Sequence, residues 1–399
     1  MSQETQALVH PAVQLSAAAQ PTEAAVTKRL VAIDLLRGVA MLLMALDHWA
    51  PFTRVDLTVE GYNGIRPELG TWGQIVTGLI TNLSSGIFFT LTGTSVAFFE
   101  RSRRKRGWTE WEITRFLLIR ALILLVLDQV VNRIGWAVTE LPLFEVLSAL
   151  AFTLAVLSVC RRLPLRIIAV LAAVLFLIYP LLVTLFPHDP ARPLSTVTTI
   201  LLQNNRDSFP MVANPLLARL SVVLFGYVVG RLLVEDRLKI SPSWLWVALG
   251  GFVAWFLLRM GLLQGYGDFL PYQPGAPFVD LFIDSKQPPS FTFLIFNMSV
   301  AIVMLVSLHM LPKRFIDTPI VWVLKVLGQT SLFFFVAHML FYRLLWRIFQ
   351  GEPIIPPALV GNSEILRLLI ECALTLVVLV PICAVYRKLR QKYSILSYL

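Results

Sequence analysis

Apolar residues follow one another in ten long blocks along the chain, separated by more polar segments. A helix that crosses a bilayer needs about 20 mostly apolar residues, and each block is close to that length. The predicted spans are 30–51, 73–99, 115–135, 143–160, 165–186, 214–233, 243–263, 291–311, 320–349 and 365–386. The sequence therefore predicts an all-α, polytopic membrane bundle of about ten transmembrane helices. The ninth block is long enough to tilt or to break, and Gly328-Gln329 is the expected place.

The positions of Lys and Arg predict the orientation of these spans. With the N-terminus inside, 20 of the 34 basic residues fall in cytoplasmic segments and six fall in the opposite loops. Cytoplasmic loops of membrane proteins carry such an excess of positive charge. Both termini are therefore expected in the cytoplasm, and the net charge of +10 is explained mainly by topology rather than by nucleic acid, which is not expected as a partner.

Composition excludes several other classes of protein. The chain of 399 residues is 57% hydrophobic and 15% charged, whereas soluble domains are about 25% charged. An ordinary cytosolic enzyme, a disordered protein and a disulfide scaffold do not fit. The three cysteines, which show no CxxC spacing, are expected to be free thiols, and no metal site is expected.

Three regions are predicted. Residues 1–28 contain no long apolar run and are rich in Ala, Gln, Thr, Ser and Pro, which predicts a disordered cytoplasmic tail. Residues 29–390 form the transmembrane domain, and 391–399 form a cytoplasmic C-terminal tail.

The first span carries an unusual set of charged side chains. At 100° per residue, Asp34, Arg37 and His48 fall on one side of the helix, and Arg37 and His48 lie roughly 16 Å apart along its axis. Asp34 and Arg37, three residues apart, can form an ion pair. One interpretation is a structural ion pair with an interfacial histidine. The other is chemistry that crosses the bilayer, with Arg37 and His48 facing a cavity open to both compartments.

Further polar groups lie within or near the other spans. His338, in the ninth span, is expected to be either a second polar site or a helix-packing hydrogen bond. The inner basic cluster after the second span is expected to anchor to anionic lipid headgroups. Alternatively, Arg103, Arg104 and Arg106 bind the phosphates of a cytoplasmic nucleotide. Other candidates, each more typical of structural pairs, are Asp128, Arg120, Glu145, Arg219 and Arg259.

Five segments, in order, carry a family resemblance. The run from Asp34-Leu35-Leu36-Arg37-Gly38 to Asp47-His48 resembles the first helix of the heparan-α-glucosaminide N-acetyltransferase catalytic-domain family, in its bacterial branch. The interval from Arg37 to His48 also resembles the motif of the related acyltransferase-3 family. The other similar segments are 88–95, 225–230, 286–290, where Gln287 replaces a tyrosine, and 328–338.

The resemblance implies a membrane acyltransferase that uses acetyl-CoA or another acyl-CoA from the cytoplasm. The acceptor is implied to be an amine or hydroxyl of an extracytoplasmic glycan or amino sugar, and the location a bacterial inner membrane. His48 would be the base or an acylated intermediate, and Arg37 a positioning cation. In lysosomal members the catalytic histidine lies in the outer loop after the first helix, but residues 49–75 contain no histidine here. Either His48 takes that role or this branch uses another chemistry.

Supporting roles are predicted with this mechanism. Because Asp47 points about 100° away from His48, an orienting group has to come from another helix, and Asp128 is the candidate. Asp34, beside Arg37, belongs to the same catalytic set. Substrate binding is assigned to Asp47, Lys286, Ser290 and His338, and cofactor binding to Arg103, Arg104 and Arg106.

Two other classes of function remain open from the sequence. A secondary transporter or flippase also needs charges inside the membrane, although no internal repeat is visible. A non-catalytic membrane partner on the same scaffold is the other alternative. Membrane lipids are expected partners of the chain, and a homodimer is a possible assembly.

Overall fold

The computed structural model describes residues 23–140, 142–187, 194–263 and 266–398. The first 22 residues of the predicted N-terminal tail lie outside the described residues, whereas residues 23–28 already belong to the first helix. The α-helices are α1 (Glu23–Trp49), α2 (Trp72–Thr81), α3 (Leu83–Lys105), α4 (Glu110–Val130), α5 (Val146–Cys160), α6 (Leu165–Leu185), α7 (Thr196–Leu202), α8 (Leu216–Val234), α9 (Trp244–Arg259), α10 (Phe291–His309), α11 (Lys313–Ile316), α12 (Pro319–Gln329), α13 (Ser331–Ile348) and α14 (Glu364–Lys392).

Short turns and strands complete the fold. A π-helical turn, η2 (Val131–Gly135), extends α4. The 3-10 turns are η1 (Ala50–Thr53), η3 (Phe278–Phe282), η4 (Pro357–Val360) and η5 (Ser394–Tyr398). The strands are β1 (Gly61–Tyr62), β2 (Leu143–Phe144), β3 (Met211–Val212) and β4 (Ser285–Gln287), and they form the parallel pairs β1–β4 and β2–β3.

Each predicted span coincides with a helix or a pair of helices. The second corresponds to α2 and α3 together, and the ninth to α12 and α13, which are separated at Thr330, directly after the predicted Gly328-Gln329. Six helical segments within the described part of the chain are long and apolar enough to cross a membrane: Trp72–Lys105, Leu165–Leu185, Leu216–Val234, Phe291–His309, Ser331–Ile348 and Glu364–Lys392. Ten crossings and two cytoplasmic termini stay predictions.

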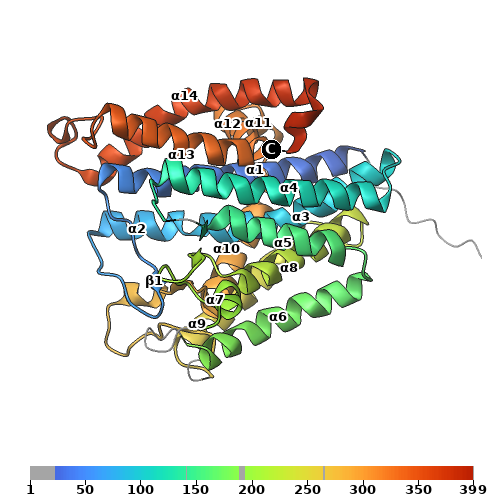
Figure 1. The fold of residues 1–399 in the computed structure, drawn as a ribbon, viewed down its shortest axis with the longest axis horizontal. Coiled ribbons are helices and arrows are strands. Elements are labelled where there is room, and N and C mark those ends of the chain that lie inside the picture. The colour runs from blue at the N-terminus through green and yellow to red at the C-terminus, as the bar shows by residue number, and fades with distance from the viewer. Residues whose placement is uncertain (1–22, 141, 188–193, 264–265, 399) are drawn as a thin grey trace, which may run out of the picture.

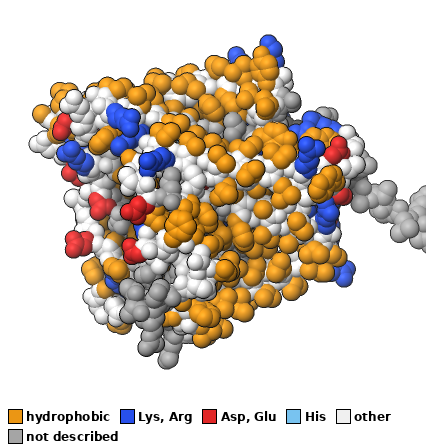
Figure 2. All heavy atoms as spheres, in the orientation of Figure 1, with side chains coloured by type: hydrophobic (Ala, Val, Ile, Leu, Met, Phe, Trp, Pro, Cys, Tyr) orange, Lys and Arg blue, Asp and Glu red, His pale blue; other side chains and the backbone are white. Residues whose placement is uncertain are grey.

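Helix α1 lies in the interior of the bundle, where it packs against α2, α3, α10, α12, α13 and α14. Figure 1 shows α12, α13 and α14 on one side of α1, with α6 and α9 at the opposite side of the molecule. The space-filling view shows hydrophobic side chains over the broad middle of one face, with charged side chains gathered toward its ends (Figure 2). This distribution is typical of a protein surrounded by lipid.

Glycines set the closest helix crossings. A Cβ atom on Gly38 of α1 would lie 2.0 Å from the carbonyl oxygen of Leu324, and one on Gly328 of α12 would lie 1.9 Å from that of Asp34. Helices α3 and α8 meet in the same way at Gly93 and Gly226. Small residues of this kind allow helix backbones to approach closely in membranes. The crossing of α1 and α12 matters for the site because it brings Gly328 beside Arg37.

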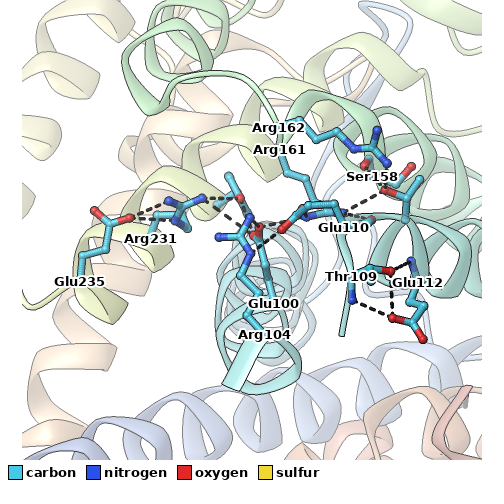
Figure 3. Close-up of polar contacts among 12 residues, drawn as sticks. Glu100, Arg104, Thr109, Glu110, Glu112, Ser158, Arg161, Arg162, Arg231 and Glu235 are labelled. Carbon is cyan, nitrogen blue, oxygen red and sulfur yellow. Dashed lines mark hydrogen bonds and ion pairs between the residues drawn. The ribbon is translucent and has the colours of Figure 1, made fainter. Parts of the chain in front are cut away.

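An ion-pair network joins four helices at the end of the bundle that the charge pattern predicts to be cytoplasmic (Figure 3). The carboxylate of Glu100 on α3, with 1% of its side chain exposed, pairs with Arg161 at 3.0 Å and with Arg104 at 2.6 Å. Arg161, which is fully buried, also pairs with Glu110 at the start of α4 at 2.6 Å. Tyr227 of α8 donates a hydrogen bond to Glu100 at 2.6 Å. The network therefore fixes the ends of α3, α4, α5 and α8 relative to one another.

Candidate active site

Two histidines from distant parts of the chain meet in the bundle. The Nδ1 atom of His48, at the end of α1, lies 3.0 Å from Nε2 of His338 on α13. The two ring planes differ by only 8°. His338 is completely buried, and its own Nδ1 lies 2.8 Å from the carbonyl oxygen of Phe334. His338 therefore forms a polar contact between α13 and α1.

Aromatic side chains enclose the histidine pair. The ring of Trp136, just after the π-helical turn, meets the ring of His48 edge-on at 5.5 Å. Phe335 contacts both imidazoles, with ring centroids 5.9 Å from that of His48 and 5.6 Å from that of His338. Unlike His338, His48 keeps partial exposure. Aromatic rings therefore surround the histidine pair, and His48 is its partly exposed member.

Asp128 does not orient His48, contrary to the prediction. Its carboxylate accepts hydrogen bonds from the backbone N–H groups of Glu145 and Leu147 and from the hydroxyl of Ser148. These donors lie at the start of α5, where helix N–H groups have no partner within the helix. Asp128 therefore caps α5, and the partner that the sequence placed on another helix is His338.

Asp47 and Lys286, two of the residues predicted to bind substrate, each have a polar partner. Asp47 accepts a hydrogen bond from Thr81 at 2.8 Å, and Lys286 pairs with Glu60 at 2.6 Å. Burial alone would lower the pKa of Lys286, but the charges of Glu60 and Asp47 outweigh it and raise this pKa above its ordinary value. Lys286 also lies close enough to His48 for its charge to act on the imidazole. Asp47 and Lys286 thus belong to one group of interacting charges near the C-terminal end of α1.

Ser290 has a different position. Its hydroxyl accepts a hydrogen bond from the N–H of Phe293 at 2.9 Å and donates one to Asp284. The side chain is fully buried at the start of α10. Ser290 is a helix cap, so the predicted contact with substrate is not available to it.

Arg37 occupies the opposite part of α1. Its guanidinium lies 3.1 Å from Asp34, which confirms the predicted ion pair, and donates to Ser95 at 2.6 Å and to the carbonyl of Gly328 at 3.1 Å. Gln329 completes this cluster by donating to Asp34 at 3.0 Å. Three helices, α1, α3 and α12, therefore hold Arg37 in place.

Arg37 and Asp34 line a cavity of about 490 Å³, which we call the arginine cavity. Three further arginines line it, Arg120 of α4 and Arg387 and Arg390 of α14, so that four guanidinium groups face a single carboxylate. Arg387 and Arg390 donate to Gln329 at 3.2 Å and 2.8 Å. Arg120 has no hydrogen-bond or ion-pair partner among the described residues. Its charged neighbours include Arg37 and Arg390, both of the same sign.

The cluster predicted to bind cofactor phosphates lies elsewhere. Arg103 stacks over Trp108 at 4.4 Å from the ring centroid, Arg104 pairs with Glu100 and Glu110, and Arg106 is exposed beyond the end of α3. From the sequence, Arg120 is a candidate for a structural pair, and Arg387 and Arg390 count only among the basic residues of the predicted cytoplasmic segments. Their three-residue spacing, which places both on one side of α14, was the available signal.

The expected open passage between Arg37 and His48 is closed. None of the residues that line the arginine cavity is His48. Met41 and Met44, on the same side of α1 between the two sites, are 0% and 4% exposed. Two methionines and the enclosing side chains therefore form an apolar barrier between the cavity and the histidine pair.

The C-terminal segment lies against a wall of the arginine cavity. Phe116, a wall residue, stacks on Tyr398 of η5 with ring centroids 4.5 Å apart. Tyr386 of α14 donates a hydrogen bond to the carbonyl of Leu396 at 2.8 Å. The segment predicted as a tail, 391–399, is therefore folded against the bundle as far as Tyr398.

Other buried charges are structural. Arg259 forms a two-atom contact with Asp268 at 2.7 and 2.8 Å and donates to four backbone carbonyls. Arg219 donates to Ser85 and Asn214, both at 3.2 Å. Glu145 accepts from Asn214 at 2.9 Å. Because these charged groups are paired with other side chains or with the backbone, their role is to hold the helices and the outer loops together.

Fold and site together define an integral membrane protein with a polar site on each side of an apolar barrier. The model of the acyltransferase-3 family, described as an acyltransferase domain, matches residues 30–387. Because this match covers most of the chain, the chain belongs to that family and is a membrane acyltransferase. A search of the curated proteins gave no match.

Proposed function

We propose that the chain transfers an acyl group, acetyl in the simplest case, from cytoplasmic acyl-CoA to an amine or hydroxyl of an extracytoplasmic glycan. The observation that carries this proposal is the placement of two sites on one helix. Helix α1 presents Arg37 to a cavity with four arginines and, farther along, presents His48 to the histidine pair.

The arginine cavity suits the phosphates of coenzyme A. Guanidinium groups bind phosphate oxygens through paired N–H donors. Four of them around one carboxylate leave excess positive charge, and Arg120 lacks a counterion among the described residues. An anionic ligand would compensate that charge. The volume of about 490 Å³ falls within the range usual for small-molecule sites.

His48 suits the role of general base. A neutral imidazole removes the proton from the acceptor as its nitrogen or oxygen attacks the thioester carbonyl. The carbon–sulfur bond then breaks, the new amide or ester forms, and the proton passes from His48 to the departing thiolate. Lys286 and its charge, close to His48, would favour the negative charge that develops on the carbonyl oxygen.

Transfer requires that the thioester arm reach His48 from the arginine cavity. Met41 and Met44 obstruct that route in this structure. Methionine is unbranched and adapts its shape readily, so displacement of these two side chains would admit a narrow acyl arm. Opening of the barrier is therefore part of the proposed mechanism.

We further propose that the chain belongs to the bacterial branch of the heparan-α-glucosaminide N-acetyltransferase catalytic-domain family and lies in an inner membrane. The arginine cavity would then face the cytoplasm. These three proposals rest on the sequence resemblance and on the charge pattern. The distribution of Lys and Arg supports the last of these.

The test uses the full chain reconstituted in vesicles, with radiolabelled acetyl-CoA on one side and a mixed glycan extract on the other. His48→Ala is expected to abolish label transfer while expression and thermal unfolding stay normal. Arg120→Gln is expected to raise the KM for acetyl-CoA at least tenfold, and the matched variant Arg106→Gln is expected to leave it unchanged. Normal turnover by His48→Ala would remove His48 from the mechanism. Glycan flux without covalent labelling would favour a transporter.

A further inference from the structure

The histidine pair contains information about where its protons lie. A carbonyl oxygen can only accept a hydrogen bond, so Nδ1 of His338, 2.8 Å from the oxygen of Phe334, carries a proton. A neutral imidazole has one N–H group and one lone pair. Nε2 of neutral His338 is therefore the acceptor, and the proton in the contact with His48 belongs to Nδ1 of His48.

This order of donors leaves one nitrogen of His48 free. With its proton on Nδ1, neutral His48 has its lone pair on Nε2, the atom that takes no part in the histidine contact. In water the opposite tautomer of histidine, protonated at Nε2, predominates. A histidine without an acceptor at Nδ1 would therefore most often present an N–H, and not a lone pair, at Nε2.

We infer that His338 is a positioning residue, which holds His48 in the Nδ1–H tautomer so that Nε2 is the basic atom of the site. The inference rests on the proposed role of His48 as the base. His338 itself touches no reacting atom and acts through His48.

The surroundings make His338 suitable for this task. Its ring is completely buried and lies 13° from parallel to Phe334, while Phe335 and Tyr342 meet it edge-on. Tyr342 in turn donates to the carbonyl of Ala45 on α1 at 3.1 Å, which ties the two helices together one turn before His48. The imidazole of His338 therefore has little freedom to rotate.

The pair also supports the protonated state of His48 during turnover. When Nε2 takes up a proton from the acceptor, Nδ1–H stays directed at Nε2 of His338 and the bond becomes charge-assisted. No proton has to move to His338, so the proton on Nε2 stays available for the departing thiolate. In the serine hydrolases an aspartate serves the equivalent purpose, and the wrong tautomer lowers kcat by about 10⁴-fold.

The decisive test reads the tautomer directly. In protein labelled with ¹⁵N-histidine and held in lipid, the pair of signals lost in His48→Ala is expected to show a protonated Nδ1 and an unprotonated Nε2. In His338→Leu, which offers no acceptor, the same signals are expected to shift toward the Nε2–H tautomer. A native spectrum with the proton of His48 on Nε2 would overturn the inference, whether or not the protein is active in the transfer assay.

Enzyme kinetics of His338 variants give a second test of the inference. His338→Gln places an amide oxygen near the position of Nε2 and is expected to keep kcat within about threefold, whereas His338→Leu is expected to lower kcat by roughly 100-fold. The KM for acetyl-CoA is expected to change less than twofold in both. His309→Leu, on α10, is the matched control for loss of a helical histidine.

The outcomes separate two kinds of failure. If His48→Ala is inactive but His338→Leu keeps the native kcat, the positioning role of His338 is wrong, whereas the role of His48 as the base is retained. If His48→Ala is fully active, the proposed function of His48 fails, while the tautomer measurement still decides the geometry. If His338→Leu does not fold, a loss of kcat in His338→Gln equal to that of His48→Ala would contradict the inference.

Discussion

At the scale of the residue, every charged or titratable group in the membrane part of α1 has a partner on another element. Asp34 accepts from Gln329, Arg37 donates to Ser95, Asp47 accepts from Thr81, and His48 contacts His338. Polar groups in a membrane helix are costly unless paired. The partners come from α12, α3, α2 and α13, so this one helix depends on the whole bundle for its stability and its chemistry.

The barrier between the two sites can be tested with one methionine. Met44→Phe is expected to lower kcat at least tenfold, because an aromatic ring cannot flex aside as a thioether chain does. Binding of acetyl-CoA in the arginine cavity is expected to stay unchanged, as measured by calorimetry. The isosteric control Met44→Leu should stay near native activity. A native rate in Met44→Phe, with an unfolding temperature unchanged, would place the acyl route elsewhere.

At the scale of the element, two devices hold the helices in register. Glycine pairs permit the backbones of α1 and α12, and of α3 and α8, to touch. The buried network around Glu100 then joins the ends of four helices (Figure 3). The first device places Arg37 against Gly328, and the second pairs Arg104 with Glu100 and Glu110.

Removal of the Glu100 carboxylate is expected to lower the stability of the protein, because this group lies at the centre of the network. Glu100→Gln removes one of the two carboxylates that form ion pairs with Arg161, a fully buried cation. Breaking a buried pair in this way costs about 3–5 kcal/mol. A large fall in the thermal unfolding temperature in detergent is therefore expected. Glu235→Gln, whose side chain is 32% exposed, is the control and should cost under about 1 kcal/mol. Equal effects of the two variants would contradict the central place of Glu100.

At the scale of the whole molecule, an apolar surface surrounds a bundle with charged ends (Figure 2). The two polar sites sit at different depths of this bundle, separated by buried methionines. The proposed transfer between opposite compartments would need this separation, since an open channel would dissipate ion gradients.

Orientation can be measured with cysteines introduced one at a time into a Cys160→Ser background, which keeps two buried cysteines. Lys239 and Gln273 are exposed at opposite ends of the predicted seventh span. In intact cells, Gln273→Cys is expected to react with a membrane-impermeant maleimide, and Lys239→Cys only after permeabilisation. Cys372 and Cys383, which are buried, should react little in either case. Labelling of Lys239→Cys in intact cells would reverse or revise the ten-span topology.

The helices could be located from the sequence because the length and apolarity of a span are local properties. The break at Thr330 and the pairing of Asp34 with Arg37 were also within reach, since each depends on residues close together in the chain. These features were determined by the sequence alone. The prediction that α1 carries the catalytic residues rests on the same short-range spacing and stays a prediction.

The partners across the bundle were decided by the tertiary structure. His48 and His338 are 290 residues apart in the chain, and Arg37 meets Arg387 and Arg390 only through the packing of α14 beside the α12–α13 pair. Helix spacing states which side a residue faces but not which helix lies opposite. For that reason Asp128 was assigned to the wrong partner, the four arginines of the arginine cavity were not grouped together, and the closed methionine barrier could not be foreseen.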